Sequence, residues 1–267
     1  MVVDIHTHAF PNDLAPRAVK KLSEVARIPA RTDGTCEGLR TSMRRAGVDL
    51  SVIMPIATKP TQVRTINAWA AEVNATYEDL LSFGTLHPLQ EDWAEEIERL
   101  VADGIRGVKL HPDYQEFFVD DAAMIPIYRA LAKARRILLL HSGVDIGIPP
   151  PVHCTPDRLA RVLDAVPELT VIAAHMGGYL RWEAVEQFLI GRDLYLDASY
   201  SLADLGPDAL VRLARAHGIE RVLFGTDSPW TDQATELAAF RDLPLSEEEK
   251  AALLGGNARR LLGLSAG

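Results

Sequence analysis

Two histidines, His6 and His8, stand at the end of the apolar run VVDIHTH at residues 2–8. Side chains alternate between the two faces of an extended strand, so alternation places Asp4, His6 and His8 on one face. Two imidazoles side by side can hold one metal ion, although such a pair also occurs on ordinary protein surfaces. The pair therefore indicates a metal site only if other parts of the chain supply further ligands.

Further candidate ligands stand at the ends of other short apolar runs. They are Lys109 and His111 in residues 105–111, His141 in 136–142, His175 in 169–175 and Asp227 in 221–227. A polar residue at the end of a buried strand costs free energy unless a partner satisfies it. One such histidine is more often a hydrogen-bonded core residue. Five strands that end in this way indicate a metal site.

The elements that must position these residues alternate along the whole chain. Amphipathic stretches with apolar residues at three- and four-residue spacing separate eight short apolar runs. The eight runs are residues 2–8, 50–56, 81–87, 105–111, 136–142, 169–175, 193–199 and 221–227. This alternation predicts an α/β fold, a single (β/α)8 TIM barrel that spans residues 1–267 as one domain. In such a barrel the carboxyl ends of all strands surround one mouth.

An open doubly wound sheet is the main alternative fold. It usually carries a glycine-rich turn after its first strand, whereas the turn here, HTHAFPND, contains no glycine. Helix boundaries are predicted at Thr155-Pro156, at Gly218 and at the capping box of Ser246 and Glu249. Residues 11–38 and 143–154 are less regular and are expected to form lids or specificity walls at the mouth.

Composition limits the class of protein. Of 267 residues, 48% are hydrophobic and 24% charged, and the net charge is -9, which argues against a nucleic-acid partner. The two cysteines are far apart and outside any CxxC pattern, which fits a reducing compartment. No membrane segment or signal sequence is evident, so we expect a cytoplasmic protein, with a homodimer as the commonest assembly for such enzymes.

The motifs DIHTH, GVKLHP, LLLHSG, AAHMGG and LFGTDSP, in this order, resemble those of the amidohydrolase superfamily. The resemblance is strongest to its branch of small metal-dependent hydrolases that also contains aminocarboxymuconate-semialdehyde decarboxylase. The closing segment GGNARRLLGL, residues 255–264, is similar to the C-terminal helix of many members. The likeness covers essentially the whole chain.

The resemblance implies a role for each strand-end residue. A first metal is expected among four residues: His6, His8, His141 and Asp227. His175 either ligates a second metal or hydrogen-bonds the reactive water. Lys109 occupies the position where two-metal members carry a carboxylated lysine or a glutamate, and it is equally well interpreted as a cation that binds an anionic substrate. One or two divalent ions are expected, zinc first, with manganese or iron as alternatives.

Three function classes remain open for a small-molecule substrate. The first is hydrolysis of an ester, lactone, amide or phosphoester by a metal-activated water, with Asp227 as proton shuttle and His175 orienting the water. The second is non-oxidative decarboxylation of an aromatic or unsaturated carboxylic acid on the same site. Hydrolysis leads because the chain is compact, whereas such decarboxylases tend to be longer. A non-catalytic barrel is the third class.

Residues that contact the substrate are predicted less directly. His111 shares a strand face with Lys109, and Tyr114 follows the same strand. Arg181 is a candidate clamp for a substrate carboxylate, although an arginine at a helix start is more often a solvated surface group. His87 ends the third strand and is a further candidate for the cavity wall.

Overall fold

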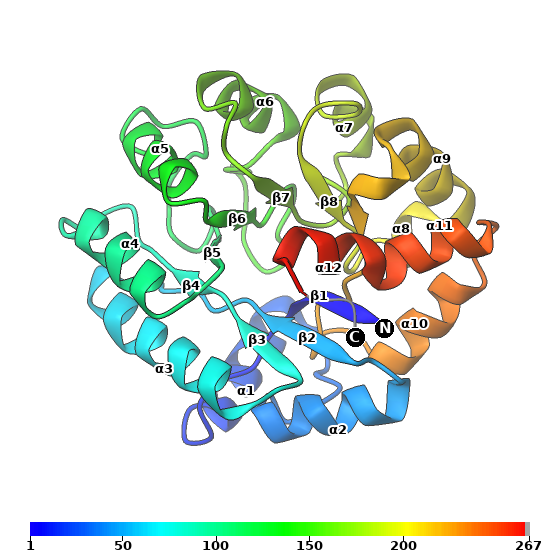
Figure 1. Cartoon of the computed structure of the whole chain (residues 1–267), viewed down its shortest axis with the longest axis horizontal. Helices are drawn as coiled ribbons and strands as arrows, with labels where there is room; N and C mark the ends of the chain where they lie inside the picture. Colours follow the sequence, from blue (N-terminus) through cyan, green and yellow to red (C-terminus); the bar gives the residue numbers. More distant parts are fainter. Residues whose placement is uncertain (265–267) are drawn as a thin grey trace.

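The computed structural model describes residues 1–264, and its centre is a ring of parallel strands (Figure 1). Each strand lies within a predicted apolar run or begins one residue before it. The strands are β1 (Val3–Thr7), β2 (Leu50–Ile53), β3 (Leu80–Ser82), β4 (Gly84–Thr85), β5 (Gly107–Leu110), β6 (Ile137–Leu140), β7 (Val171–Ala173), β8 (Tyr195–Asp197) and β9 (Val222–Leu223). β3 pairs with β2 and β4 with β5, so these two segments form one strand position interrupted at Phe83.

The ring closes between its last and first strands. Backbone N–H groups donate from Ile5 to Phe224 O at 3.0 Å and from His8 to Ser228 O at 2.6 Å. Thr7 and Ser228 form a parallel bridge beyond the end of β9. Eight parallel strand positions in a closed ring make a (β/α)8 barrel, so the predicted fold is confirmed.

Helices surround the barrel in the order that the sequence predicts (Figure 1). The outer helices are α2 (Cys36–Ala46), α3 (Val63–Thr76), α4 (Trp93–Ala102), α5 (Ile125–Lys133), α6 (Pro156–Ala165), α7 (Trp182–Phe188), α9 (Pro207–His217) and α10 (Gln233–Arg241). Shorter elements are α8 (Leu202–Leu205), α11 (Glu247–Ala251), α12 (Asn257–Leu262), the 3₁₀ turns η1 (Pro60–Gln62) and η2 (Ile219–Arg221), and the π turn η3 (Ala252–Gly256). Helix α6 begins after Thr155, α9 ends at Gly218, and Ser246 and Glu249 form the predicted capping box of α11.

Two apolar layers hold the barrel together. Side chains such as Val108 and Leu140 pack outward against the helices, whereas Leu139 and Ile172 fill the interior. Helix α12 lies across the amino-terminal end of the barrel (Figure 1), and its Leu262 packs into the inner layer. That end is therefore sealed, and the opposite end, where the strands finish, is left for the site.

Strand β1 does not follow strict alternation. The pairing with β2 shifts between Asp4 and Thr7, which is a bulge. Asp4 accepts hydrogen bonds from Thr226 and from the Gln233 side chain of α10, and burial raises its pKa to about 7. The expectation that Asp4 shares a face with His6 and His8 is therefore wrong, because the bulge reverses the pattern between them.

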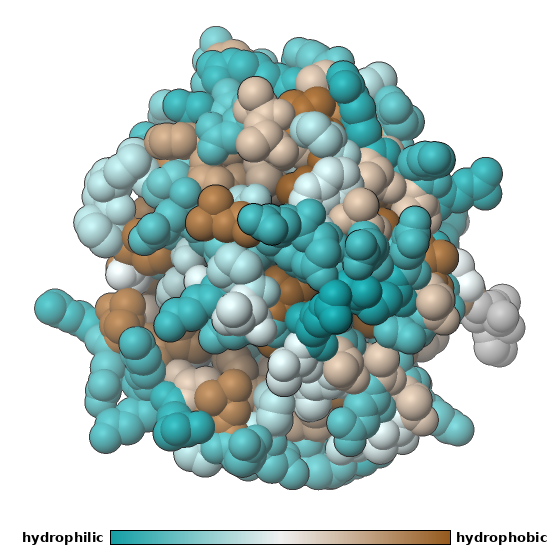
Figure 2. All heavy atoms as spheres, turned by 90° about the vertical axis from the view of Figure 1, so that its left-hand side faces the viewer, coloured by the Kyte–Doolittle hydropathy of each residue, from teal (hydrophilic) through white to brown (hydrophobic). Residues whose placement is uncertain are grey.

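The irregular segment 11–38 contains a helix that the sequence pattern did not predict. Helix α1 (Ala15–Ala26) is amphipathic, but Ala15 is its only fully buried residue. The surface on the side of α3 and α4 is mostly hydrophilic, with hydrophobic residues in separate small groups (Figure 2). In the described part of the chain, no helix combines the length and the apolar character that crossing a membrane requires.

Candidate metal centre

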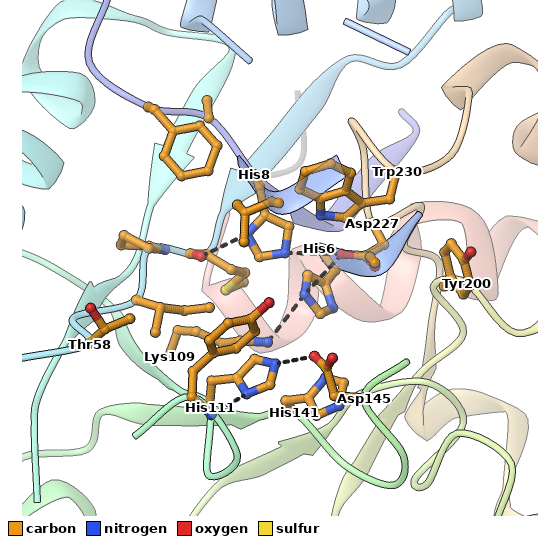
Figure 3. A pocket seen from close by; sticks show the side chains of 18 of the residues that line it. His6, His8, Thr58, Lys109, His111, His141, Asp145, Tyr200, Asp227 and Trp230 are labelled. Carbon is orange, nitrogen blue, oxygen red and sulfur yellow. Dashed lines mark hydrogen bonds and ion pairs between the residues drawn. The ribbon is translucent and has the colours of Figure 1, made fainter. Parts of the chain in front are cut away.

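The strand-end residues meet at the carboxyl ends of the barrel strands (Figure 3). His6 lies in β1, His8 directly follows it, and Asp227 follows β9. The ligand atoms of these three residues lie within 4.8 Å of one another. The three residues that were predicted from the two ends of the chain thus form one cluster.

Three imidazoles are anchored through Nδ1. The His8 Nδ1–H donates to Met54 O at 3.0 Å, that of His6 to the Asp197 carboxylate at 3.0 Å, and that of His175 to Ser199 O at 3.0 Å. A carbonyl or carboxylate oxygen only accepts, so each Nδ1 carries the proton. Burial and the nearby Lys109 lower the pKa of His6 to about 4, so its ring is neutral. In their neutral forms these rings carry the lone pair on Nε2, as in histidines that bind metals.

Two of these lone pairs face a carboxylate. His8 Nε2 lies 3.0 Å and His6 Nε2 3.6 Å from Asp227 Oδ1. Burial raises the pKa of Asp227, but a proton on His8 Nε2 and a charge on His6 would lower it well below its usual range, so this carboxylate favours a cation beside these nitrogens. An anionic oxygen between two acceptor nitrogens needs a cation to join them. The donor set therefore fits a divalent metal with nitrogen and oxygen ligands.

His141 adds an unsatisfied atom to the same site. Its Nδ1 lies 3.1 Å from His175 Nε2, which has a lone pair and so accepts the proton of His141. His141 Nε2 is then a buried acceptor without a hydrogen-bond partner in the structure. Burial and the neighbouring His111 keep the pKa of His141 well below its usual value. A neutral, orphaned imidazole nitrogen is the kind of atom that a metal satisfies.

Lys109 is a buried amine in direct contact with the cluster. Its side chain is 1% exposed, and Nζ lies 3.2 Å from His6 Nε2. Burial lowers its pKa to about 8, while the Asp197 and Asp227 carboxylates act in the opposite direction. Both interpretations of Lys109, as a carboxylated bridge and as an anchor for an anion, remain proposals.

His111 forms a pair with an acid that the sequence did not single out. His111 Nδ1 accepts from the backbone N–H of Tyr114 at 3.3 Å, so its Nε2 carries the proton and lies 3.2 Å from Asp145 Oδ2. The His111 ring stacks on His141 with 4.0 Å between centroids and planes 10° apart. Lone pairs in two parallel planes do not converge on one ion. His111 therefore holds Asp145 in place, and both line the cavity.

Two predicted substrate residues lie away from the cavity. Arg181 is exposed at the start of α7 and lines a separate surface depression with Trp182 and Glu183. His87 is buried beside the strand end, where its Nδ1 accepts from the backbone N–H of Leu89 at 3.2 Å. The structure brings Tyr114 and His111 to the cavity but neither Arg181 nor His87.

The cluster forms the floor of a cavity of about 370 Å³. Its outer walls come mainly from α1, α3 and the loops after β2 and β6. Aromatic side chains among the lining residues are Phe10, Trp69, Tyr114, Tyr179, Tyr200 and Trp230. The site thus combines a polar floor with largely apolar walls, which is the usual character of a small-molecule site.

Sequence reasoning missed Asp197 and Ser199, which support the histidines. Asp197 is fully buried, and burial, which raises its pKa, is outweighed by its contact with the His6 imidazole, so that the pKa falls to about 2. Ser199 Oγ lies 3.1 Å from both His6 Nδ1 and His175 Nδ1. Asp197 could have been found from the sequence, because it lies inside the apolar run DLYLDAS and a buried carboxylate requires hydrogen-bond partners.

Asp197→Asn is expected to weaken metal binding by about 10- to 100-fold. The reason is that its amide oxygen would stay with the backbone N–H of Ser199 and its NH₂ group would face His6 Nδ1, which then lacks the carboxylate acceptor that fixes its tautomer. Competition with a chromophoric chelator measures this affinity for Zn²⁺ and Mn²⁺. Asp193→Asn, at an exposed position near the start of the same strand, is the matched control. An unchanged affinity in Asp197→Asn would show that metal binding does not depend on the Asp197 carboxylate beside His6.

With this geometry established, comparison with known proteins identifies the family. The chain matches the amidohydrolase family over residues 3–264, and it therefore belongs to that family. No match was found among curated proteins. The resemblance that the strand-end motifs suggested is confirmed.

Solved structures similar to this chain share its fold at low identity. An uncharacterised TIM-barrel protein of Bordetella bronchiseptica is 22% identical, with a TM-score of 0.78 and 98% of each chain covered. 5-Carboxyvanillate decarboxylase from Sphingomonas paucimobilis is 19% identical, with a TM-score of 0.75 and 99% of each chain covered. The Novosphingobium aromaticivorans enzyme of the same name, complexed with manganese and 4-hydroxy-3-methoxy-5-nitrobenzoic acid, is 16% identical, with a TM-score of 0.75 and 99% and 96% covered.

Proposed function

We propose that the protein is a metal-dependent, non-oxidative decarboxylase of an aromatic or unsaturated carboxylic acid. The observation that carries the proposal is the setting of the ligand cluster, at the floor of a cavity with apolar and aromatic walls. Such walls accommodate a ring and disfavour a carboxylate relative to neutral carbon dioxide. Structures of similar fold that bear the name decarboxylase support this choice over hydrolysis. Their likeness extends over both chains, so compactness is no argument for hydrolysis.

Each residue of the cluster has a role in the proposed decarboxylation. His6, His8, His141 and Asp227 hold the divalent ion, which when bound polarises the acid and neutralises charge at the reacting end. Lys109 binds the substrate carboxylate. When the bond to that carboxylate breaks, the electron pair stays on the substrate carbon, which then takes up a proton. The proton comes from solvent water, and we assign Asp227 Oδ1, an anion, to its relay from that water to the carbon.

Hydrolysis is the second candidate. The observation that favours it is Asp227 itself, an anionic carboxylate held against His8 at 3.0 Å, where it can take a proton from water. The substrates of such a hydrolase would be esters, lactones, amides or phosphoesters.

Carbon dioxide release is the test that separates the two candidates. Purified protein is incubated with a panel of hydroxybenzoic and unsaturated carboxylic acids, and carbon dioxide and product are both quantified. We expect equimolar carbon dioxide and decarboxylated product from at least one acid. Turnover of esters or lactones without decarboxylation of any acid would establish hydrolysis instead.

Metal removal is the control for this assay. Dialysis against a chelator should abolish product formation, and Mn²⁺ or Zn²⁺ should restore it. The Tm should fall by about 5 °C, because an ion that binds only the folded state stabilises it. The ion that restores the most activity identifies the preferred metal.

A further inference from the structure

The outer part of the cavity is an apolar chamber above the cluster of candidate metal ligands that forms the floor. Leu22 of α1 and Leu14, which directly precedes that helix, line one wall. Ile66 and Trp69 of α3 line another. Leu14 is 40% exposed although it is a large apolar side chain. Partly exposed leucines that face a cavity have apolar surface left to bury, which a ligand can cover.

The charges in the cavity are few and unevenly placed. Within the described residues 1–264, Lys109 is the one lysine or arginine among the lining side chains, and Asp145 and Asp227 are the acids. Asp145 lies on the loop after β6, beside His111 and His141 at the floor of the cavity (Figure 3). His111 Nε2–H donates to Asp145 Oδ2 at 3.2 Å.

These charges accommodate one anionic group on the substrate. A carboxylate at Lys109 has a cation beside it, whereas a second carboxylate further out would meet apolar walls with no lysine or arginine among the described lining residues. Arg181 lines another depression, and the exposed Arg31, which acts electrostatically on Tyr200, does not line the cavity. An uncompensated anion in such surroundings is strongly disfavoured.

We propose that the substrate is a monocarboxylic aromatic acid with an uncharged, apolar substituent that occupies the chamber between α1 and α3. This inference rests on the proposed function for the reacting end but concerns the rest of the substrate. The cavity volume of about 370 Å³ falls in the range of sites for ligands larger than a single ring acid. The proposal separates this protein from a decarboxylase of 5-carboxyvanillate, whose substrate carries two carboxylates.

Binding of unreactive probes to the metal-loaded protein tests the proposal without any turnover. Titration calorimetry compares benzoate, 4-butylbenzoate and isophthalate. Each buried methylene is worth about fourfold in affinity, so 4-butylbenzoate, with four more carbons, should bind about 200-fold more tightly than benzoate. Isophthalate, with its second carboxylate, should bind at least about tenfold more weakly than benzoate.

Variants of the chamber wall sharpen the test. Leu22→Ala and Leu14→Ala should each reduce the advantage of 4-butylbenzoate by about fivefold and leave benzoate binding unchanged. Leu89→Ala is the matched control, because Leu89 is 75% exposed and does not line the cavity. Leu22→Arg should improve isophthalate binding by supplying the missing cation.

The outcomes distinguish this inference from the proposed function. Equal affinities for benzoate and 4-butylbenzoate, or isophthalate binding as tight as benzoate, would overturn the inference whatever the reaction is. A clear butyl advantage together with no carbon dioxide from any acid would overturn the decarboxylase assignment and leave the apolar chamber established.

Discussion

Asp227→Asn is expected to lower kcat by about 10²- to 10⁴-fold, the range that removal of a general acid or base gives. Asparagine keeps the shape of the side chain but cannot exchange a proton or carry the negative charge that faces His8 at 3.0 Å. Steady-state kinetics on the best acid of the panel measures the rate, and elemental analysis of the same sample measures bound metal.

His8→Ala separates the loss of proton transfer from the loss of metal. This variant removes a neutral nitrogen ligand and leaves Asp227 in place, so we expect metal content and activity to fall together. If Asp227→Asn instead keeps both its metal and a near wild-type rate, Asp227 has no part in proton transfer. Circular dichroism of both variants shows whether the barrel remains folded.

The strands were predictable because a barrel strand is buried on both faces and appears in sequence as a continuous apolar run. LLL at residues 138–140 is an example. Helix α1 was missed although Ala18, Leu22 and Val25 recur at four- and three-residue spacing; its apolar face lines the cavity instead of a packed core. The bulge in β1 was also hidden, since pairing with β2 and not local sequence decides where alternation fails.

The candidate ligands were predictable for a local reason: a histidine at the carboxyl end of a barrel strand is already at the mouth. Their supporting residues depend on contacts between distant segments, as Asp197 with His6 shows. Arg181 is the opposite case, a residue that was predicted to contact the substrate but lies outside the cavity. The preceding residue, Leu180, has a φ of 54°, a left-handed conformation, and the chain turns there before α7 begins at the surface.

Lys109 decides how many metals the site holds and how the substrate is held. As a carboxylated bridge it would join two ions, whereas as an ammonium it would bind the substrate carboxylate. Burial lowers its pKa to about 8, so at pH 7 the greater part of it is protonated. A cation that the nearby Asp197 and Asp227 carboxylates favour is better placed to bind an anion than to join metals, so we assign it to the substrate.

Lys109→Met is therefore expected to raise KM by about 10- to 100-fold, as loss of a hydrogen bond to a charged group does, while one metal per chain is retained. Lys109 loses its proton as the pH rises through about 8, so the wild-type KM should rise above that pH and this rise should vanish in the variant. Lys133→Met, at an exposed position on α5, is the matched control. A fall from two bound ions to one in Lys109→Met would instead establish the bridge, because an anchor for substrate has no effect on metal content.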